Sequence, residues 1–356
     1  MGRQLEPMDP QLTSIQPGGG VVIHLEMAWG VLRRCWLKTF RRGYVKRMAD
    51  SRQGEHNGCP HEVLDPRDLK FYRNQPGYWW RPEDDPFTGR DRLPFVRVGL
   101  AELMVFSALT WGPAGGLIWW LTSTRASSHL ASQPQWITWS GWTGVALLVA
   151  IGLIIAWFFR NPKRVPPDDP HAVLAPADGK VVEIREIDFD EYIAGPAVQI
   201  GIFLSLFNVH INRSPRPARV IGLSYRRGKF LNAGRPEAST ENEQLAVRLE
   251  ETGGSERPLI VRQITGLIAR RIVCWLKPGD TLFSGQVFGM IKLGSRTELV
   301  LPREDGLELL VELGQMVQAG TSVVARFLPD SGPTIGSDAN QGTSSRIAVA
   351  SCLPCF

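Results

Sequence analysis

Apolar residues are concentrated in two long runs before the middle of the chain. The first extends over Val98–Thr122, with Glu102 near its start and Pro113 in its middle. The second extends over Trp136–Phe159 and contains no charged residue. About 20 apolar residues suffice for a helix that crosses a bilayer. Both runs within 98–159 are therefore predicted to be transmembrane helices, with a buried helix of a soluble protein as the alternative.

The charges beside these runs predict their orientation. The loop between them carries only Arg125, whereas positive residues flank both outer ends: Arg90, Arg92, Arg97, Arg160, Lys163 and Arg164. Cytoplasmic flanks carry the excess of Lys and Arg in membrane proteins. Both termini are therefore expected in the cytoplasm. Tryptophans near the predicted ends are typical of the two membrane interfaces: Trp119, Trp120, Trp136, Trp139 and Trp157.

The pattern changes after Asn161. Short runs rich in Val and Ile alternate with Gly, Pro and Asp, which is typical of β-strands separated by turns. Residues 160–330 are therefore expected to form a mainly β, sandwich-like soluble domain with some helix, followed by a tail over 331–356. Leu267–Cys274 is a helical candidate, and Glu241–Gln244 is ambiguous between helix and strand.

Residues 1–97 are expected to be irregular, because Gly and Pro interrupt the segment repeatedly. No charged start followed by an apolar run indicates a signal peptide, and Met27 or Met48 is a hypothetical alternative start. Residues 33–47 contain seven Lys or Arg, no acid and three aromatic residues. Anionic lipid is one partner that this pattern favours. A solvated arm and a nucleic-acid contact are the alternatives, and no other feature of the chain supports nucleic acid.

Composition narrows the function classes further. The net charge is +5, and the five cysteines show no disulfide framework. Cys352 and Cys355 form one C-x-x-C pair without the second pair that a zinc site needs. No phosphate-binding loop, dinucleotide fingerprint or nucleophile elbow is present. A metal is therefore not expected, and a reducing, cytoplasmic setting fits the cysteines.

Four short segments carry the residues that could do chemistry. They are LAPADGKV with Asp178, FLSLFNVHINRSPRP with His210 and Arg213, QITGLIARRIV with Arg270 and Arg271, and GMIKLGSRTELVLP with Gly294, Ser295 and Arg296. Each has an ordinary interpretation: a turn, a core histidine, an amphipathic helix with a basic face, and a second turn. Individually, these segments do not identify a function.

Together, in this order and spacing, the four segments resemble the phosphatidylserine decarboxylase family of pyruvoyl enzymes. Phe158–Pro167 and Glu241–Gln244 are also similar to that family, and the resemblance covers residues 157–327. The sequence Leu293-Gly294-Ser295-Arg296 is similar to the shorter branch, whose processing site reads Gly-Ser-Arg. Some members carry a histidine at the position of Phe207, so this chain departs from them there.

The resemblance implies a self-cleaving enzyme. Ser295 would attack the Gly294 carbonyl, and cleavage would leave a covalent pyruvoyl group derived from Ser295. That group is the electron sink for converting phosphatidylserine to phosphatidylethanolamine and CO₂. The resemblance makes His210 the base, oriented by Asp178. It also implies that the α and β chains stay associated with each other. The orientation predicted from the flanking charges puts the catalytic domain on the cytoplasmic side of the cell membrane. A homo-oligomer is left open.

Positive charge suggests residues that would hold the phosphate or carboxylate of the lipid: Arg296, Arg213, Arg270 and Arg271. The main rival interpretation is a membrane-anchored biotinyl or lipoyl-like carrier domain, in which Lys292 would be modified at a hairpin tip. It leaves the segments around Asp178 and His210 unexplained. A scaffold without catalysis and a lipid of archaeal type are further alternatives.

Overall fold

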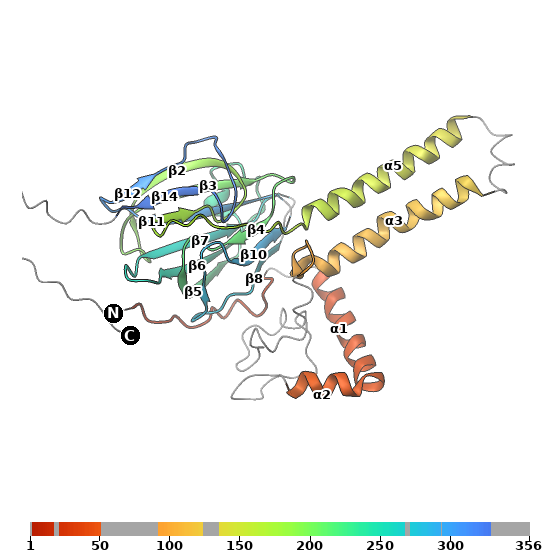
Figure 1. Ribbon diagram of the computed structural model, residues 1–356, viewed down its shortest axis with the longest axis horizontal. Helices are drawn as coiled ribbons and strands as arrows, with labels where there is room; N and C mark the ends of the chain where they lie inside the picture. Colours follow the sequence, from red (N-terminus) through yellow and green to blue (C-terminus); the bar gives the residue numbers. More distant parts are fainter. Residues whose placement is uncertain are drawn as a thin grey trace, which may run out of the picture.

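A computed structural model describes residues 2–17, 21–50, 92–123, 135–267, 271–292 and 294–328. Several predictions of the sequence fall outside these ranges. They concern Arg90, Arg125, Arg270, Leu293 and the Cys352–Cys355 pair. The described part consists of a β domain, a long helical hairpin and an N-terminal segment with two helices (Figure 1).

Two helices form the hairpin that projects from the β domain (Figure 1). They are α3 (Leu100–Thr122) and α5 (Gln135–Phe158), and they pack against each other. Both predicted membrane segments exist as helices. In the described ranges, only α5 combines the length and the hydropathy that a membrane-spanning helix needs. Glu102 and Pro113 in α3 are the interruptions that the sequence already showed.

The β domain is built on one eight-stranded antiparallel sheet. Its strand order is β13-β2-β3-β11-β7-β6-β5-β9. The bounds are β2 (Gly179–Asp190), β3 (Gly195–Leu204), β5 (Ala218–Arg226), β6 (Gln244–Glu251), β7 (Pro258–Ile264), β9 (Thr281–Leu282), β11 (Ser295–Pro302) and β13 (Met316–Val317). The central position of β11, between β3 and β7, places the Gly294–Ser295 step at the end of a fully paired strand.

Two three-stranded sheets complete the domain. One has the order β4-β10-β8, with β4 (Ile211–Arg213), β8 (Arg271–Cys274) and β10 (Val287–Lys292). The other has the order β1-β14-β12, with β1 (Ala172–Leu174), β12 (Leu307–Leu309) and β14 (Val323–Phe327). The β4-β10-β8 sheet lies at the end of the domain beside the base of the hairpin (Figure 1). The expectation of a mainly β domain is confirmed.

Alternation along β11 explains which residues meet in the core. Leu299 and Leu301 lie on the inner face, in the large apolar core, whereas Val300 belongs to a smaller cluster on the outer face. Successive side chains of a strand point to opposite faces, so Ser295 and Thr297 also face inward. Both are fully buried. Ser295 is therefore on the same face as the main core.

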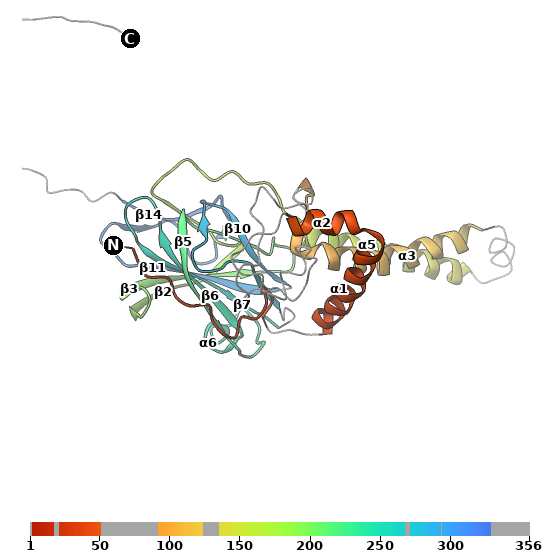
Figure 2. The same ribbon diagram turned by 90° about the horizontal axis from the view of Figure 1, so that it is seen from below.

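The N-terminal region differs from the irregular structure expected for residues 1–97. Helices α1 (Val21–Phe40) and α2 (Arg42–Asp50) occupy a stretch without proline, whereas the interrupting Pro residues lie on either side of it. Before them, residues 2–17 run along the β domain (Figure 2). The fully buried Leu12 belongs to the main core. The arm that precedes the helices therefore contributes to the core of the β domain.

The helix predicted over Leu267–Cys274 is wrong for its second half. Residues 271–274 form strand β8, whose four residues pair with Gly289–Lys292 of β10. Three of those four residues are buried, so strand pairing and packing override the helical pattern. The ambiguous Glu241–Gln244 segment divides between the end of the short helix α6 (Ala238–Glu241) and the start of β6.

Candidate active site

The Gly294–Ser295 step joins two sheets. Gly294 has a left-handed φ of +64° and lies between β10 and β11, and Ser295 pairs with Leu204 of β3. Glycine adopts this backbone conformation without the steric cost that a side chain adds. The Ser295 hydroxyl is buried and has no hydrogen-bond partner within the described part of the chain. A buried hydroxyl without a partner is costly, and such groups merit a functional explanation.

His210 lies directly beside this step. Its Nε2 accepts a hydrogen bond from the Gly294 N–H at 3.1 Å, and its Nδ1 is 2.9 Å from the Asn208 carbonyl oxygen. Because Nε2 accepts from a backbone N–H, it carries no proton. The proton of the neutral ring is then on Nδ1, which donates to Asn208. The nitrogen that faces the cleavage step is therefore the basic one.

Burial keeps the His210 ring neutral. The ring is fully buried and packs against Phe158 of α5, with ring centroids 4.5 Å apart. Desolvation lowers the pKa of His210 to about 4, and nearby Arg160 adds to the decrease. At neutral pH, the imidazole can thus accept a proton. The base of the hairpin supplies one wall of its pocket.

Asp178 does not orient His210 by a hydrogen bond in this structure. Its carboxylate binds Arg164 through two bonds of 2.7 and 2.6 Å and accepts a third, of 2.8 Å, from the Ala319 N–H. The orienting contact to His210 comes from the Asn208 carbonyl instead. Asp178 is held in an ion pair with Arg164, and its predicted role toward His210 stays a prediction.

The predicted lipid-binding arginines are mostly occupied by the protein itself. Arg296 is fully buried on the outer face of β11, bound to Glu298 at 2.8 Å and to Glu183. Arg213 donates to the carbonyl oxygens of Gly285 and Pro162 at 3.0 Å and to the Asn161 side chain at 3.1 Å. Arg296 thus links β11 to β2, and Arg213 holds the segment that follows α5.

Arg271 lies closest to the base of the hairpin among the described candidates. Its guanidinium is 3.6 Å from the carboxylate of Glu102 in α3. In the small sheet, Arg271 is the strand partner of Lys292, whose ammonium group also binds Glu102. Arg270 lies outside the described residues. The carrier interpretation is corrected at this point, because Lys292 is buried in β10 and is not at an exposed hairpin tip.

A buried polar chain supports the strands around the site. Thr297 accepts a hydrogen bond from Asn212 at 2.9 Å, and Asn212 accepts one from Gln263 at 2.9 Å. All three side chains are fully buried. Hydrogen bonds between buried side chains on different strands fix the relative positions of those strands. It holds β4, which follows His210, against β7 and β11.

Gly266 is a site residue that sequence reasoning missed. A Cβ atom at this position would lie 2.2 Å from the Gly294 carbonyl oxygen. The absence of a side chain thus lets the Thr265-Gly266 backbone approach the peptide that is predicted to be cleaved. The only signal in the sequence was a single glycine after a strand, which is common.

Glu243 lies at the start of the second strand away from Ser295 in the large sheet. Strand β7 pairs with β11, and β6 pairs with β7. The Thr265 N–H, just after β7, donates a hydrogen bond to the carbonyl oxygen of Glu243, just before β6. The side chain is buried, and desolvation raises the pKa of Glu243 to about 7. The similarity noted for Glu241–Gln244 therefore falls near the site.

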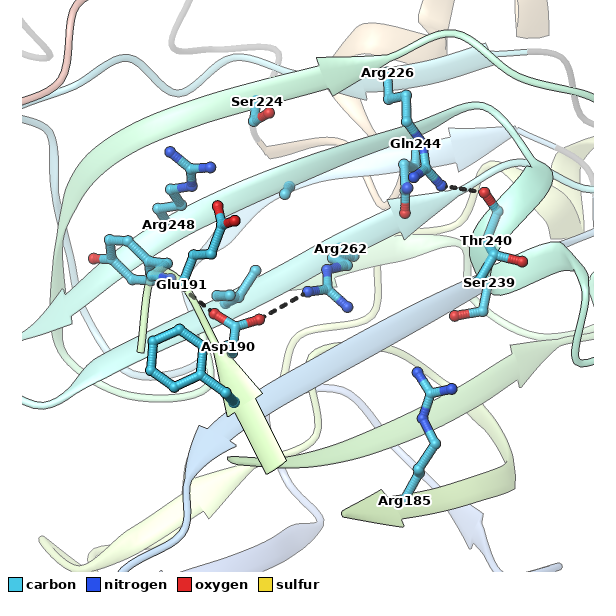
Figure 3. A pocket seen from close by; sticks show the side chains of 14 residues that line it. Arg185, Asp190, Glu191, Ser224, Arg226, Ser239, Thr240, Gln244, Arg248 and Arg262 are labelled. Carbon is cyan, nitrogen blue, oxygen red and sulfur yellow. Dashed lines mark hydrogen bonds and ion pairs between the residues drawn. The ribbon is translucent and has the colours of Figure 1, made fainter. Parts of the chain in front are cut away.

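A solvent-facing hollow of about 430 Å³ lies elsewhere, on the outer face of the sheet (Figure 3). Arginines and acids share its wall, and Arg262 binds Asp190 at 3.2 Å. Because Ser295 faces inward, the sheet separates this hollow from it. No group of three His, Cys, Asp or Glu in the described ranges could hold a metal ion.

Comparison with known proteins identifies the family. Residues 151–325 match the family model described as phosphatidylserine decarboxylase. A protein of Rhodopirellula baltica named phosphatidylserine decarboxylase proenzyme is 48% identical over 263 residues, which make up 73% of this chain and 99% of that protein. The chain belongs to the phosphatidylserine decarboxylase family.

Other members of the phosphatidylserine decarboxylase family match over shorter stretches. Proenzymes of this name from Carboxydothermus hydrogenoformans and Salinibacter ruber are 46% and 40% identical. The matches cover 52% and 62% of this chain and 85% and 97% of those proteins. The resemblance read from the four sequence segments is thereby confirmed, and the carrier alternative has no support.

Proposed function

We propose that the chain is a proenzyme that cleaves itself between Gly294 and Ser295 and then decarboxylates phosphatidylserine. The observation that carries this proposal is the hydrogen bond between a neutral, buried imidazole and the N–H of Gly294, the residue whose carbonyl would be attacked. A serine hydroxyl is a weak nucleophile until a base takes its proton. Here the basic nitrogen of His210 contacts Gly294, the residue directly before that serine.

Self-cleavage balances with groups that the chain and water supply. His210 Nε2 takes the Ser295 hydroxyl proton, the oxygen bonds to the Gly294 carbonyl carbon, and the Gly294–Ser295 C–N bond breaks to give an ester. Loss of the Ser295 α-proton then breaks the Cβ–O bond and releases Gly294 as a carboxylate. One water enters and one ammonia leaves as the new chain end becomes a ketone. The ring must turn from the Gly294 N–H to the hydroxyl for the first step.

The residues around Ser295 fit a pyruvoyl group. When formed, the group supplies the electron sink for loss of CO₂. Its precursor is buried at the start of β11, where His210, Gly266 and the inner face of the sheet would enclose it. A water-excluding site favours loss of charge from a carboxylate. His210 is the group placed to return a proton to the substrate carbon.

Both chains would stay together after cleavage. The chain that begins at Ser295 contributes β11, which is hydrogen-bonded to β3 on one side and β7 on the other. It also contributes β13 and β14, which pair with β2 and β1. Cutting one peptide bond leaves these ladders intact. We further propose that α3 and α5 anchor the enzyme in the membrane, with the β domain on the cytoplasmic side.

Intact mass tests the proposal directly. Purified wild-type protein should give two chains, residues 1–294 and residues 295–356, with the second lacking the mass of one ammonia. Ser295→Ala should give one full-length chain, and phosphatidylserine vesicles should release CO₂ only with the wild type. Recovery of the wild type as one uncut chain, with an unmodified Ser295, would contradict the proposed function.

A further inference from the structure

Three exposed apolar side chains border the cleavage site, on two loops beside the hairpin. We infer that Leu206, Phe207 and Leu267, here called the apolar rim, rest in the lipid bilayer and bring its surface to the mouth of the catalytic site. This inference rests on the proposed function, because it specifies how a lipid would reach Ser295.

The first loop presents its apolar residues by construction. Asn208 closes a turn with Ser205: its N–H donates to the Ser205 carbonyl, and its side-chain oxygen accepts from the Ser205 N–H at 2.9 Å. Leu206 and Phe207 occupy the two central positions, where the side chains point outward. Phe207 is 66% exposed.

This turn is also directly connected to the chemistry. Its first residue follows Leu204, the strand partner of Ser295. Its last residue supplies the carbonyl that binds His210 Nδ1. Any surface that contacts Phe207 is therefore close to both the serine and its base.

The second loop approaches the site from the opposite strand. Leu267 follows Gly266, which packs against the Gly294 carbonyl, and its side chain is largely exposed. The rim thus has members on both neighbours of β11: the turn follows β3, and Leu267 follows β7. The Gly294–Ser295 step lies between them.

The base of α5 continues the rim toward the membrane anchor. Trp157 donates from Nε1 to the Phe207 carbonyl at 3.2 Å, and Arg160 donates to the same oxygen at 2.9 Å. Arg160 also stacks over the Trp157 ring at 4.0 Å. A partly exposed tryptophan beside an arginine, at the end of an apolar helix, is the composition of a membrane–water interface. The rim is held at that depth by two hydrogen bonds.

A bilayer is the partner that these features favour. The turn that carries Phe207 is bonded to the end of the helix that is long and apolar enough to cross a membrane, and the nearby positive residues Arg160 and Lys163 complement anionic head groups. Transfer of exposed apolar side chains beside such a helix from water into the acyl region lowers the free energy. A lipid could then keep its chains in the bilayer while its head group reaches Ser295.

Phe207→Ser tests the inference, with Phe189→Ser as a matched control. Phe189 is 65% exposed but lines the outer hollow, at the end of the β2–β3 pair opposite the Phe203–Leu204 end. Each full-length protein is assayed twice: in proteoliposomes that contain long-chain phosphatidylserine, and in detergent with a short-chain, water-soluble phosphatidylserine. Self-cleavage on a denaturing gel reports that each variant folds, and Leu267→Ser provides a second rim variant.

Phe207→Ser should lower the proteoliposome rate at least about tenfold, the effect of withdrawing part of one aromatic side chain from lipid. Its rate with the soluble substrate, its self-cleavage, and both rates of Phe189→Ser should stay near wild type. Equal losses with both substrates, or no loss in proteoliposomes for either rim variant, would overturn the inference. A wild type that cleaves but decarboxylates neither substrate would instead refute the proposed function.

Discussion

At the scale of single residues, the protonation state of His210 governs the first step of the proposed chemistry. The ring is buried against Phe158, and its one basic nitrogen accepts a hydrogen bond from the N–H of Gly294, next to the peptide bond that would be cleaved. An imidazole in water would be half protonated near pH 6.5. The buried ring stays neutral well below that pH, so it remains a base under mildly acidic conditions.

We therefore expect the rate of self-cleavage to be insensitive to pH between about 8 and about 5, and to fall as the pH passes through about 4. Proenzyme made by cell-free synthesis can be shifted to each pH and followed on a denaturing gel. The same pKa shift also predicts how the stability of the folded protein depends on pH. The unfolded chain takes up the His210 proton first, so stability from this group is present above about pH 6.5 and declines as the pH falls toward 4. A cleavage midpoint near pH 6.5 would contradict the burial argument.

The sequence predicted the reacting residues, through the family resemblance, but not their supports. Gly294, Ser295 and His210 stood out only from the combination of motifs, and the structure brings His210 into contact with the Gly294–Ser295 step. Asn208 acts through its backbone carbonyl, which side-chain identity does not reveal. The partner of Asp178 was also unforeseeable, because Arg164 follows the apolar helix and reaches the LAPADGKV turn only through the tertiary fold.

At the scale of elements, the loop after β7 and the turn before β11 must approach closely for the site to form. Gly266→Ala places a Cβ atom where the Gly294 carbonyl oxygen now lies. We expect self-cleavage to slow by at least about tenfold, because displacement of the reacting carbonyl by about 1 Å can cost about a hundredfold. Gly195→Ala is the control, since a Cβ atom there meets nothing within 4 Å. The two rates are compared by pulse-chase; cleavage of Gly266→Ala at the wild-type rate would show that the close approach is unimportant.

A second element-scale contact joins α3 to the strand before the cleavage site. Lys292 of β10 and Glu102 of α3 form a buried ion pair, with Arg271 nearby. Lys292→Met should destabilise the protein by about 3 kcal/mol, because it weakens the compensation of a buried carboxylate. Arg326→Met breaks the exposed pair with Asp169 and should cost at most about 1 kcal/mol. Denaturant unfolding in detergent measures both, and equal small losses would contradict the role of the buried pair.

Outside the two apolar runs, strands were predicted better than helices, for a physical reason. Val and Ile runs bounded by Gly and Pro have few other structures available, and the β-rich texture after Asn161 was read correctly. Residues 271–274 belong to a stretch that was predicted to be an amphipathic helix, and pairing with β10 makes them strand β8. The helices of residues 21–50 were missed because the Gly and Pro residues on either side of them suggested irregular structure for the whole of residues 1–97.

At the scale of the whole molecule, the catalytic domain is held from two sides. The hairpin base packs on β4, β8 and β10 at one end. Along the sheet, the arm of residues 2–17 adds backbone bonds to it: the Glu6 N–H donates to Ile221, and the Cys274 N–H donates to Ile15. The arm is thus part of the domain although it is separated from it in sequence by the helices.

The arm's contribution can be tested with two leucines that it carries. Leu12 is fully buried in the main core, whereas Leu5 is largely exposed. Leu12→Ala removes buried methyl groups and leaves a cavity, so it should lower the free energy of unfolding by about 2–5 kcal/mol, or the Tm by several degrees. Leu5→Ala should change it by less than about 0.5 kcal/mol. Thermal unfolding of the processed protein in detergent measures both. If Leu12→Ala were as mild as Leu5→Ala, the arm would be resting on the domain without sharing its core.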